Sequence, residues 1–502
     1  MLMSRNHYTV AMNRGTGRRL CRFSEAEAPQ SANILGGRRT RGYTAPDHSG
    51  VVGLRVDLRQ PRVAPSGYIT VTSMLNSSPL PAAPALVVNA NNIAALLPIR
   101  VLGRKGIPVT CVFGRGLRSQ YAPVVRASRF VANVQTFDET DYEANLVQCL
   151  CDIGKASRDK AVLYPASDLD MIVISGHRHR LEAHYHLLMP PHPLLMNLLN
   201  KDWFYPFAAE RGIPVPRTLQ VNRPSELDAA ARKVGFPCIV KPAWRDEAWQ
   251  TYYGNQKVLK VHDADELRLV CRCLHERQYE LTVQEIIPGP ERNLLCTFTY
   301  LNERSESLGI FTSTKVRQFP PHFGNSSLVK QVNEHAVVQL TTHICKQLGL
   351  VGYASIEFKK DDRDGSFKVI EITPCRFNRQ AGLSEAAGLS LPYVWYRHLL
   401  NHQTDCSVTS GNVAWISEVN EARAFWQYWR NGEYTLLQWL ASYRGVTEYE
   451  VFAKDDPLPF LALLPSALSQ WIMRSLYRPA VLPIQRRPAS ARAVAAVQQR
   501  AS

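Results

Sequence analysis

Two glutamates are the residues of this chain best suited to hold a metal ion. Glu357 and Glu371 each stand between two large apolar residues, inside short apolar runs. Asp364-Gly365 separates the runs and is a strong hairpin signal, so we expect the two runs to pair as neighbouring strands. Because a desolvated carboxylate without a partner is costly, two that converge favour a divalent cation such as Mg²⁺, which adds phosphate oxygens and water. The pair therefore indicates nucleotide-phosphate chemistry.

The elements that precede this pair begin with an α/β pattern at residue 85. The pattern predicts strands over 85–88, 109–113, 129–131 and 161–165, and helices over 93–106, over 139–155 and after Asp168. Strands that alternate with helices predict a parallel sheet. The loop 89–92 has no glycine where a dinucleotide-binding loop would need several, so we assign no dinucleotide site there.

The middle of the chain continues with mixed elements. We expect a helix-to-strand unit over 197–222, strands over 236–242, 257–261, 281–287, 293–301 and 308–314, and helices over 225–234, 263–276 and 331–348. After Pro392 the chain becomes aromatic and helical, which indicates a packed C-terminal region. We expect the last apolar helix, 460–476, to pack in the core, with a membrane surface or a partner protein as the alternatives.

The charge of the chain is concentrated at its two ends. Of 502 residues, 45% are hydrophobic and 20% are charged, with a net charge of +16. Residues 1–80 hold eleven Arg, no Lys and four acids, and residues 478–502 hold five Arg and no acid. The body is therefore nearly balanced, which argues against a nucleic-acid-binding surface on the fold. We expect the two ends to be disordered; a transit peptide, or a start of translation at Met74, is the alternative for residues 1–73.

The cysteines show no metal-binding or disulfide pattern. Eleven of them are scattered, and Cys149-x-Cys151 and Cys271-x-Cys273 are too closely spaced for a usual zinc pair. We expect a reducing compartment and a cytoplasmic location. The sequence has no run of 18 apolar residues, so it predicts no stable membrane insertion.

The order of the charged pieces along the chain resembles the ATP-grasp superfamily, with carboxylate–amine ligases of the D-aspartate ligase type most similar. The pieces are Lys201, Lys241 with Pro242, the segment 285–291, and the two glutamates. The resemblance covers roughly residues 85–475. It implies an α/β (α+β grasp) fold: an N-terminal parallel α/β pre-ATP-grasp domain, a two-part ATP-grasp domain and a helical C-terminal cap. The boundaries that we expect are 1–84 for the leader, 85–195, 196–400 with lobes 196–284 and 285–400, 401–477, and 478–502 for the tail.

The resemblance assigns five residues to ATP. Lys201 and Lys241 match the lysines that contact the α- and β-phosphates, and an ammonium is a point charge suited to a polyphosphate. The backbone C=O of Glu285 and N–H of Ile287 match the hinge groups that read the adenine edge. Glu291 matches the acid that holds the ribose hydroxyls.

Four cations are implied as catalytic. Lys315 and Arg317 stand where related ligases place cations near the γ-phosphate, and we expect them to share one face of a strand. Alternating cations there would neutralise the charge of an acyl phosphate. Arg376 and Arg379 resemble the arginines that hold the substrate carboxylate or phosphate. The segment 323–327 that follows the first pair is expected to be a flexible substrate loop.

The resemblance also implies the metal ligands and shows three departures. Glu357 and Glu371 match the Mg²⁺ (or Mn²⁺) ligands, and Thr373 stands where the family usually has an asparagine as the third. Asn378 is the alternative donor. The family arginine after the proline is displaced by one residue to Arg376, and the phosphate-covering loop 243–256 has only one glycine. These departures bear on metal affinity and turnover.

The activity implied is an ADP-forming ligase that uses ATP and Mg²⁺ to join a small-molecule carboxylate to an amine through an acyl phosphate. Two alternatives stay open: biotin-carboxylase-like carboxylation and a non-catalytic nucleotide-binding protein. The sequence names neither the carboxylate nor the amine. It also leaves a homo-oligomer open.

Overall fold

The computed structural model describes residues 83–116, 121–242, 249, 253, 256–276, 279–403 and 411–465, and the strands of residues 11–12 and 19–20. The chain forms two compact units, Met1–Asn76 and Ser77–Ser502. In the first, β1 (Ala11–Met12) pairs antiparallel with β2 (Arg19–Leu20). The rest of the predicted leader before residue 83, the tail 478–502 and most of the loop 243–256 lie outside the described residues. All that follows concerns the second unit.

A five-stranded parallel sheet opens this unit, in the order β5-β4-β3-β6-β7. Its strands are β3 (Ala85–Val88), β4 (Val109–Arg115), β5 (Val131–Asp138), β6 (Ala161–Pro165) and β7 (Tyr185–His186). Alternate residues of β3 pack into two separate apolar clusters, so helices cover both faces of the sheet, as a parallel sheet requires. The predicted parallel sheet is confirmed. The third strand begins at Val131, so its predicted range 129–131 was wrong.

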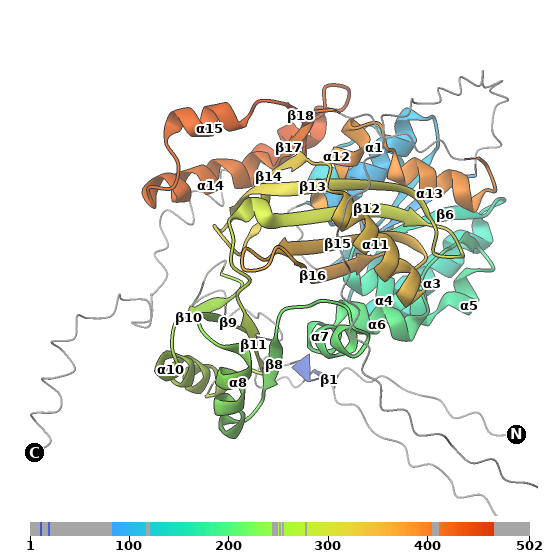
Figure 1. Ribbon diagram of the computed structural model, residues 1–502. Helices are drawn as coiled ribbons and strands as arrows, with labels where there is room; N and C mark the ends of the chain where they lie inside the picture. The colour runs from blue at the N-terminus through green and yellow to red at the C-terminus, as the bar shows by residue number, and fades with distance from the viewer. Residues whose placement is uncertain are drawn as a thin grey trace, which may run out of the picture. The chain divides into compact units, whose positions relative to one another are not determined.

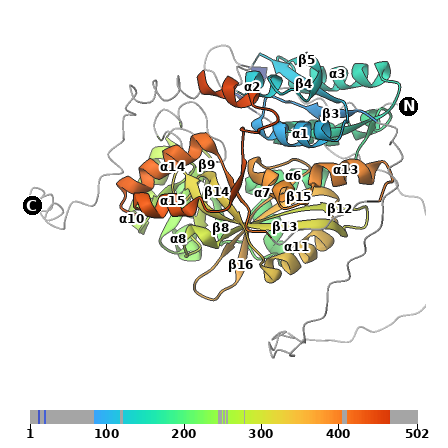
Figure 2. The same cartoon turned by 90° about the horizontal axis from the view of Figure 1, so that it is seen from above.

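The helices of this region are short and follow the strands. They are η1 (Ile93–Ala95), α1 (Leu96–Arg104), α2 (Ala122–Arg126), α3 (Tyr142–Ala156), α4 (Asp168–Gly176), α5 (Arg178–Leu181) and α6 (His192–Leu199). Asn92 caps η1 and Ser167 caps α4 with a capping box, which explains why both helices begin directly after strand ends. In Figures 1 and 2, this sheet and its helices form the blue and teal part of the chain.

A four-stranded antiparallel sheet follows, in the order β10-β9-β11-β8. This part of the chain comprises β8 (Thr218–Val221), η2 (Pro224–Glu226), α8 (Leu227–Val234), β9 (Cys238–Pro242), β10 (Leu259–Val261), α10 (Ala264–His275) and β11 (Leu281–Glu285). The preceding helix, α7 (Lys201–Glu210), packs with α11 (His335–Leu348) instead. The apolar faces of α8 and α10 pack on one side of the sheet, together with Trp249. The opposite side is therefore left to face a cavity, which Ile239, Lys241 and Gln284 line.

The largest sheet has seven strands, in the order β16-β15-β12-β13-β14-β17-β18. Its elements are η3 (Glu291–Asn293), β12 (Leu294–Leu301), β13 (Ser307–Phe319), β14 (Asn325–Gln331), α11 (His335–Leu348), β15 (Gly352–Lys360), β16 (Phe367–Pro374), β17 (Ala414–Ile416) and β18 (Val446–Tyr449). Neighbouring strands are antiparallel except β17 and β18. Two expectations are corrected here: most of the segment predicted as a flexible loop, 323–327, belongs to β14, and helix α11 begins at His335, not at 331.

The C-terminal region contributes both helices and strands. Its helices are η4 (Arg379–Ala381), α12 (Gly382–Ala386), α13 (Leu391–Leu399), α14 (Glu418–Arg430) and α15 (Leu436–Ser442). The strands β17 and β18 extend the large sheet, so the expected helical cap is in part a continuation of that sheet. Helix α13 contacts both α1 and the large sheet, and Figure 2 shows it between them. Of the last apolar helix, the structure describes residues 458–465, where Leu463 is buried and Leu461 is exposed.

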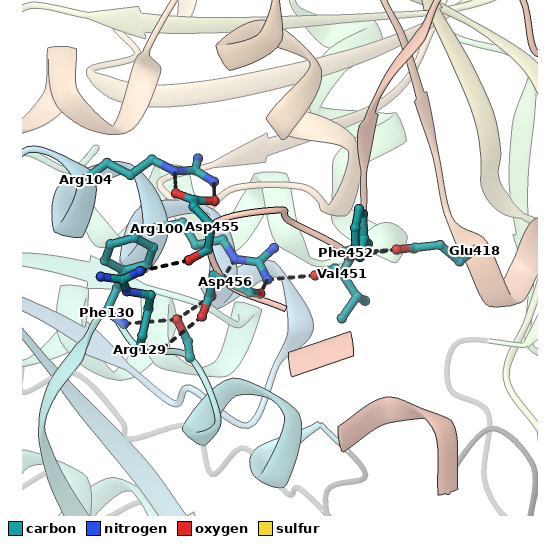
Figure 3. A network of polar contacts seen from close by, with 10 residues as sticks. Arg100, Arg104, Arg129, Phe130, Glu418, Val451, Phe452, Asp455 and Asp456 are labelled. Atoms are coloured by element: carbon teal, nitrogen blue, oxygen red, sulfur yellow. Dashed lines mark hydrogen bonds and ion pairs between the residues drawn. The ribbon is translucent and has the colours of Figure 1, made fainter. Parts of the chain in front are cut away.

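A segment near the end of the described chain binds the first sheet region through buried charge (Figure 3). Asp456 accepts hydrogen bonds from Arg100, at 2.9 Å, and from the Ser128 hydroxyl, at 2.7 Å. Arg100 also donates to the backbone C=O of Val451, at 2.7 Å. The next acid, Asp455, forms a two-bond pair with Arg104 that is exposed to solvent. Residues 451–456 thus connect the C-terminal region to α1.

None of the helices in the described part of the chain is long and apolar enough to cross a membrane.

Candidate active site

A large cavity, with a volume of about 2110 Å³, is lined by residues from all three sheet regions. It collects all but one of the twelve residues that the sequence marked. Those that line it are Lys201, Lys241, Glu285, Ile287, Glu291, Lys315, Glu357, Glu371, Thr373, Arg376 and Arg379. The exception is Arg317. The roles of these residues stay predictions, but their convergence on one cavity is a finding.

Glu357 and Glu371 are direct partners across the β15–β16 ladder. Ile356 and Phe358 turn to the other face, where they pack with α11 and α7, so that the intervening Glu357 is left on the cavity side. The turn that connects the strands contains Gly365, at φ +74°, a conformation that favours glycine. The register shifts between Glu357 and Phe358, and this shift sets the two carboxylates opposite each other, where both line the cavity.

The surrounding cations favour the charged form of Glu371. Burial raises the pKa of Glu371, but the charges of Lys201 and Arg376, followed by those of Lys257 and Lys315, outweigh burial and lower the pKa below its ordinary value. Lys315 forms a buried ion pair with Glu357, with 2.6 Å between Nζ and Oε2. Burial lowers the pKa of Lys315, but Glu357 outweighs it and leaves the pKa raised. The two carboxylates therefore lie among cations that compensate their charge.

The donor atoms at this point fit a hard divalent cation that a triphosphate also binds. Among the described residues, no cluster of three His, Cys, Asp or Glu side chains is suited to hold a metal alone. Two carboxylates are what Mg²⁺ usually takes from a protein when phosphates supply the other oxygens. The Asn378 amide donates to the Ser355 hydroxyl, at 3.1 Å, while its Oδ1 is buried with no hydrogen-bond partner in the described part of the chain. The Thr373 hydroxyl lies 3.5 Å from Glu371 Oε1. Thr373 therefore contacts Glu371 directly, and Asn378 contacts Ser355, which is paired with Thr373 in the sheet.

Two lysines that face the cavity have strongly lowered pKa values. Burial, together with the charge of Lys201, lowers the pKa of Lys241 to about 7. Its ammonium lies 3.4 Å from the Tyr205 hydroxyl and 3.3 Å from Gln284 Oε1. Burial likewise lowers the pKa of Lys257 to about 8, with Lys315 as the next cause. Burial destabilises the charged form of these lysines, and a bound anion would stabilise that form again. The arrangement therefore favours the binding of a polyphosphate.

Lys257 is a site residue that the sequence reasoning missed. It lies just before β10, lines the cavity and donates to Asn325 Oδ1, at 2.7 Å. The available signal was its place at the start of an apolar run, directly after the predicted phosphate-covering loop.

The segment after β11 is held by side chains from the hairpin. The Glu285 carboxylate pairs with Arg217, at 2.9 Å, and with Arg363, at 2.6 Å. Burial raises the pKa of Glu285, but the hydrogen bonds from the two arginines outweigh it and leave the pKa lowered. The Lys359 ammonium donates to the C=O groups of Gly289 and Pro290, at 2.8 and 2.7 Å. Both carboxylate oxygens of Glu285 are thus engaged by the two arginines.

Two arginines that line the cavity, Arg376 and Arg379, are paired with acids. Arg376 donates to Asp168, at the start of α4, and Arg379 donates to Glu450. Burial lowers the pKa of Arg379, but Glu450 outweighs it and leaves the pKa raised. This end of the cavity therefore presents charges of both signs, suited to a carboxylate or to a substrate that carries both a carboxylate and an ammonium.

The structure does not bring Arg317 to the cavity, which corrects the expectation that it shares a face with Lys315. The pairing of β13 with β14 shifts register on both sides of Arg317. An irregularity of this kind breaks the alternation of side chains along a strand. Arg317 is fully buried and donates to Glu421 of α14, with Nε 2.6 Å from Oε1. It connects the large sheet to the C-terminal helices instead of facing a substrate.

Comparison with known proteins identifies relatives of part of the chain. No family model matches the sequence. The chain is 24% identical over 284 residues to the D-aspartate ligase of Enterococcus faecium. The matched region covers 54% of this chain and 67% of the relative. The chain is 27% identical over 212 residues to the carbamoyl phosphate synthase large chain of Gemmatimonas aurantiaca, which covers 39% of this chain and 18% of that relative. The chain thus matches under a fifth of the second protein's length.

Two solved structures share the fold at low sequence identity. One is the biotin carboxylase domain of the Hydrogenobacter thermophilus 2-oxoglutarate carboxylase, in complex with MgADP, ADP and bicarbonate, at 13% identity and a TM-score of 0.51, over 66% of this chain and 73% of that chain. The other is an N5-carboxyaminoimidazole ribonucleotide synthetase in complex with ADP, at 14% identity and a TM-score of 0.50, over 67% of this chain and 81% of that chain.

Proposed function

We propose that this chain, which belongs to the ATP-grasp superfamily, is an ADP-forming ligase that joins a small-molecule carboxylate to an amine. The observation that carries the proposal is the registered pair of Glu357 and Glu371 in one cavity with Lys201 and Lys241. The name of the D-aspartate ligase relative supports carbon–nitrogen bond formation. We also propose that the protein uses ATP and Mg²⁺ (or Mn²⁺). The cytoplasmic location expected from the cysteines is part of the same proposal.

The residues of the cavity divide the work of binding ATP. The main chain of Glu285 and Ile287 reads the base edge, and Glu291 accepts hydrogen bonds from the ribose. Lys241, with Lys201 beside it, binds the phosphates, and the bound phosphate restores the charge that burial disfavours on Lys241. A lysine is suited to this task because its ammonium is a compact charge with three donors.

The acidic pair supplies the metal ligands. Glu357 and Glu371 would hold Mg²⁺, with Thr373 or Asn378 as the third donor, and the ion would neutralise phosphate charge as a Lewis acid when bound. Because Lys315 is already paired with Glu357 at 2.6 Å, it stands where it also meets a phosphate oxygen beside that carboxylate. Lys315 and the bound ion would thus supply positive charge from the same side of the sheet.

The reaction then follows from position. The substrate carboxylate attacks the γ-phosphorus, and the bond from that phosphorus to the β-phosphate oxygen breaks. ADP departs, and the substrate becomes an acyl phosphate. The amine attacks the acyl carbon, loses a proton and displaces phosphate to give the amide. Lys315 stabilises the charge on the transferring group, and Arg376 and Arg379 hold the carboxylate. The acceleration comes mostly from orientation and fixed charge.

The domain boundaries are part of the same proposal. Residues 85–195 form the pre-ATP-grasp domain, 196–400 the ATP-grasp domain with its lobes divided at 284, and 401–477 the C-terminal region. The strands β8 to β11 of the four-stranded sheet end at Glu285, which supports a division of the lobes at that point.

A coupled assay of ADP release tests the proposal. The protein is incubated with MgATP and a panel of amino acids, singly and in pairs, and both ADP and the amide product are measured. We expect ADP release that depends on a carboxylate, and amide formation that also needs an amine. Tight ATP binding without turnover for any carboxylate would instead favour a nucleotide-binding protein, and release that needs bicarbonate would favour carboxylation.

A further inference from the structure

Glu291, the proposed ribose acid, is held by residues that lie far from it in the sequence. Its Oε1 accepts a hydrogen bond from the hydroxyl of Tyr428, on helix α14, and another from the backbone N–H of His322, at 2.7 Å. Its Oε2 is buried with no hydrogen-bond partner among the described residues. All three residues line the cavity. One oxygen is therefore engaged by the protein, and the other is left to accept.

Tyr428 is itself fixed on several sides. Its side chain is 2% exposed, and its hydroxyl accepts from the backbone N–H of Gln318, at 3.4 Å, while it donates to Glu291. Burial and the charge of Glu291 raise the pKa of Tyr428 far above its ordinary value. The shift favours the protonated hydroxyl, which is the form that donates to Glu291. Its ring also packs edge-on against that of Tyr434, with 5.6 Å between centroids.

His322 adds a second contact from another direction. It lies in the turn between β13 and β14 at φ +72°, a conformation that is uncommon for a non-glycine residue. Its Nδ1 lies 3.4 Å from Glu291 and its Nε2 3.4 Å from Glu433. The hydrogen bond with Glu291 raises the pKa of His322, which favours the charged ring between the two acids. The carboxylate of Glu291 is thus bounded by the large sheet and by α14.

We propose that Tyr428 is a positioning residue for Glu291, so that the C-terminal helix α14 completes the ribose end of the nucleotide site. This inference rests on the proposed function, since it takes Glu291 as the acceptor for the ribose hydroxyls. A carboxylate fixed through one oxygen offers the other at low conformational cost. The site should therefore prefer a ribonucleoside triphosphate to an analogue that lacks both ribose hydroxyls. This preference would depend on the hydroxyl of Tyr428, which lies outside the two lobes.

The test compares nucleotides rather than rates. Dissociation constants for MgATP and for the 2′,3′-dideoxy analogue are measured by calorimetry in the full chain, in Tyr428→Phe and in Tyr434→Phe, the matched control on the ring that packs against Tyr428. We expect Tyr428→Phe to weaken ATP binding about tenfold, as for a lost hydrogen bond to a charged group, and to leave the dideoxy analogue unchanged. Tyr434→Phe should change neither affinity.

Equal weakening of both nucleotides by Tyr428→Phe, or no change in either, would overturn the inference. Should Tyr428→Phe fail to fold, His322→Ala serves as the second variant, because it removes the ring and keeps the backbone donor; it should lower the preference by a smaller factor, and an unchanged preference would count against the inference. Binding separates the two proposals: a full chain that makes no amide but prefers ATP to its dideoxy analogue, with that preference reduced in Tyr428→Phe, contradicts the ligase and supports the role of Tyr428. A full chain that binds both nucleotides equally contradicts the ribose role of Glu291 and with it the role of Tyr428, but leaves the ligase reaction standing if amide is formed.

Discussion

Arg363, on the turn between β15 and β16, donates to the carboxylate of Glu285 at the end of β11, with 2.6 Å between Nη2 and Oε1. The same turn donates the backbone N–H of Asp362 to the C=O of Pro288, at 3.3 Å. The hairpin that carries Glu357 and Glu371 is therefore bonded to the segment that we propose reads the base. The proposed base-binding segment and the two glutamates are thus held by the same hairpin.

We predict that Arg363→Ala weakens ATP binding about two- to fivefold, the range expected when half-exposed charged contacts are lost. The hinge would lose the side-chain contact of Glu285 with Arg363, while the contacts from Lys359 and from the backbone of Asp362 remain. Calorimetry with MgATP measures the change. Arg304→Ala is the matched control, because Arg304 pairs with Glu306 on a different hairpin turn. An Arg363→Ala protein that binds ATP as tightly as the unaltered chain would show that the contact of Arg363 with Glu285 does not support nucleotide binding.

We predict that Glu371→Gln abolishes ADP release while the protein stays folded. The amide is nearly the same size but has lost the charge that a metal ligand needs, a loss of several kcal/mol, or about 10²- to 10³-fold or more in rate. ADP release and the thermal unfolding midpoint are measured together. Glu306→Gln, on an exposed turn, should keep full activity. Full activity in Glu371→Gln would end the metal assignment.

We predict that ATP affinity falls as the pH rises above about 7. The pKa of Lys241 is lowered to about 7, so the free protein loses this ammonium above that pH, and the charged form is the one that binds phosphate. The dissociation constant should rise up to about tenfold for each pH unit, until the pKa of the bound state is reached. Phosphate monoesters lose their second proton near pH 6, so the measurements should run from pH 7 to 9.

Lys241→Met provides the control for this pH dependence. It should bind ATP weakly at pH 7 and show a flatter profile, with the part that remains assigned to Lys257, whose pKa is lowered to about 8. The same slope in Lys241→Met and in the unaltered chain would show that another group titrates.

We predict that Asp456→Asn destabilises the protein by about 3–5 kcal/mol, because it leaves the Arg100 guanidinium buried without its counterion. Side chains of this pair are only 7% and 1% exposed. The neighbouring Asp455→Asn breaks a pair with Arg104 that is 45% and 38% exposed, and should cost under about 1 kcal/mol. Chemical denaturation of both variants measures the free energy of unfolding. Equal effects would contradict the role of burial.

Features that depend on neighbouring residues were predicted well from the sequence. The β15–β16 hairpin follows from an apolar alternation and one Asp-Gly pair, both of which act within twenty residues. The pairing of Glu357 with Glu371 also depends on a register shift beside Glu357, which the alternation does not predict. The strands 85–88 and 161–165 were likewise found at their observed bounds, because continuous apolar runs are typical of a parallel sheet.

Features that depend on distant partners were missed. The register shift that turns Arg317 away from the cavity exists because β13 pairs with β14, and the acid that receives Arg317 lies 104 residues later. Tyr428 was invisible as a site residue for the same reason, since its partner Glu291 lies 137 residues earlier. Spacing along the chain carries no information about such pairs, which only the assembled sheet defines.

The pair of Arg100 and Asp456 has a consequence for how the chain is made. The two residues are 356 positions apart, so Asp456 leaves the ribosome long after the first parallel strands are available to fold. Until then α1 must carry a cation that has no counterion. We expect the first sheet region to remain loosely ordered during synthesis, and to complete its packing only when residues 451–456 arrive.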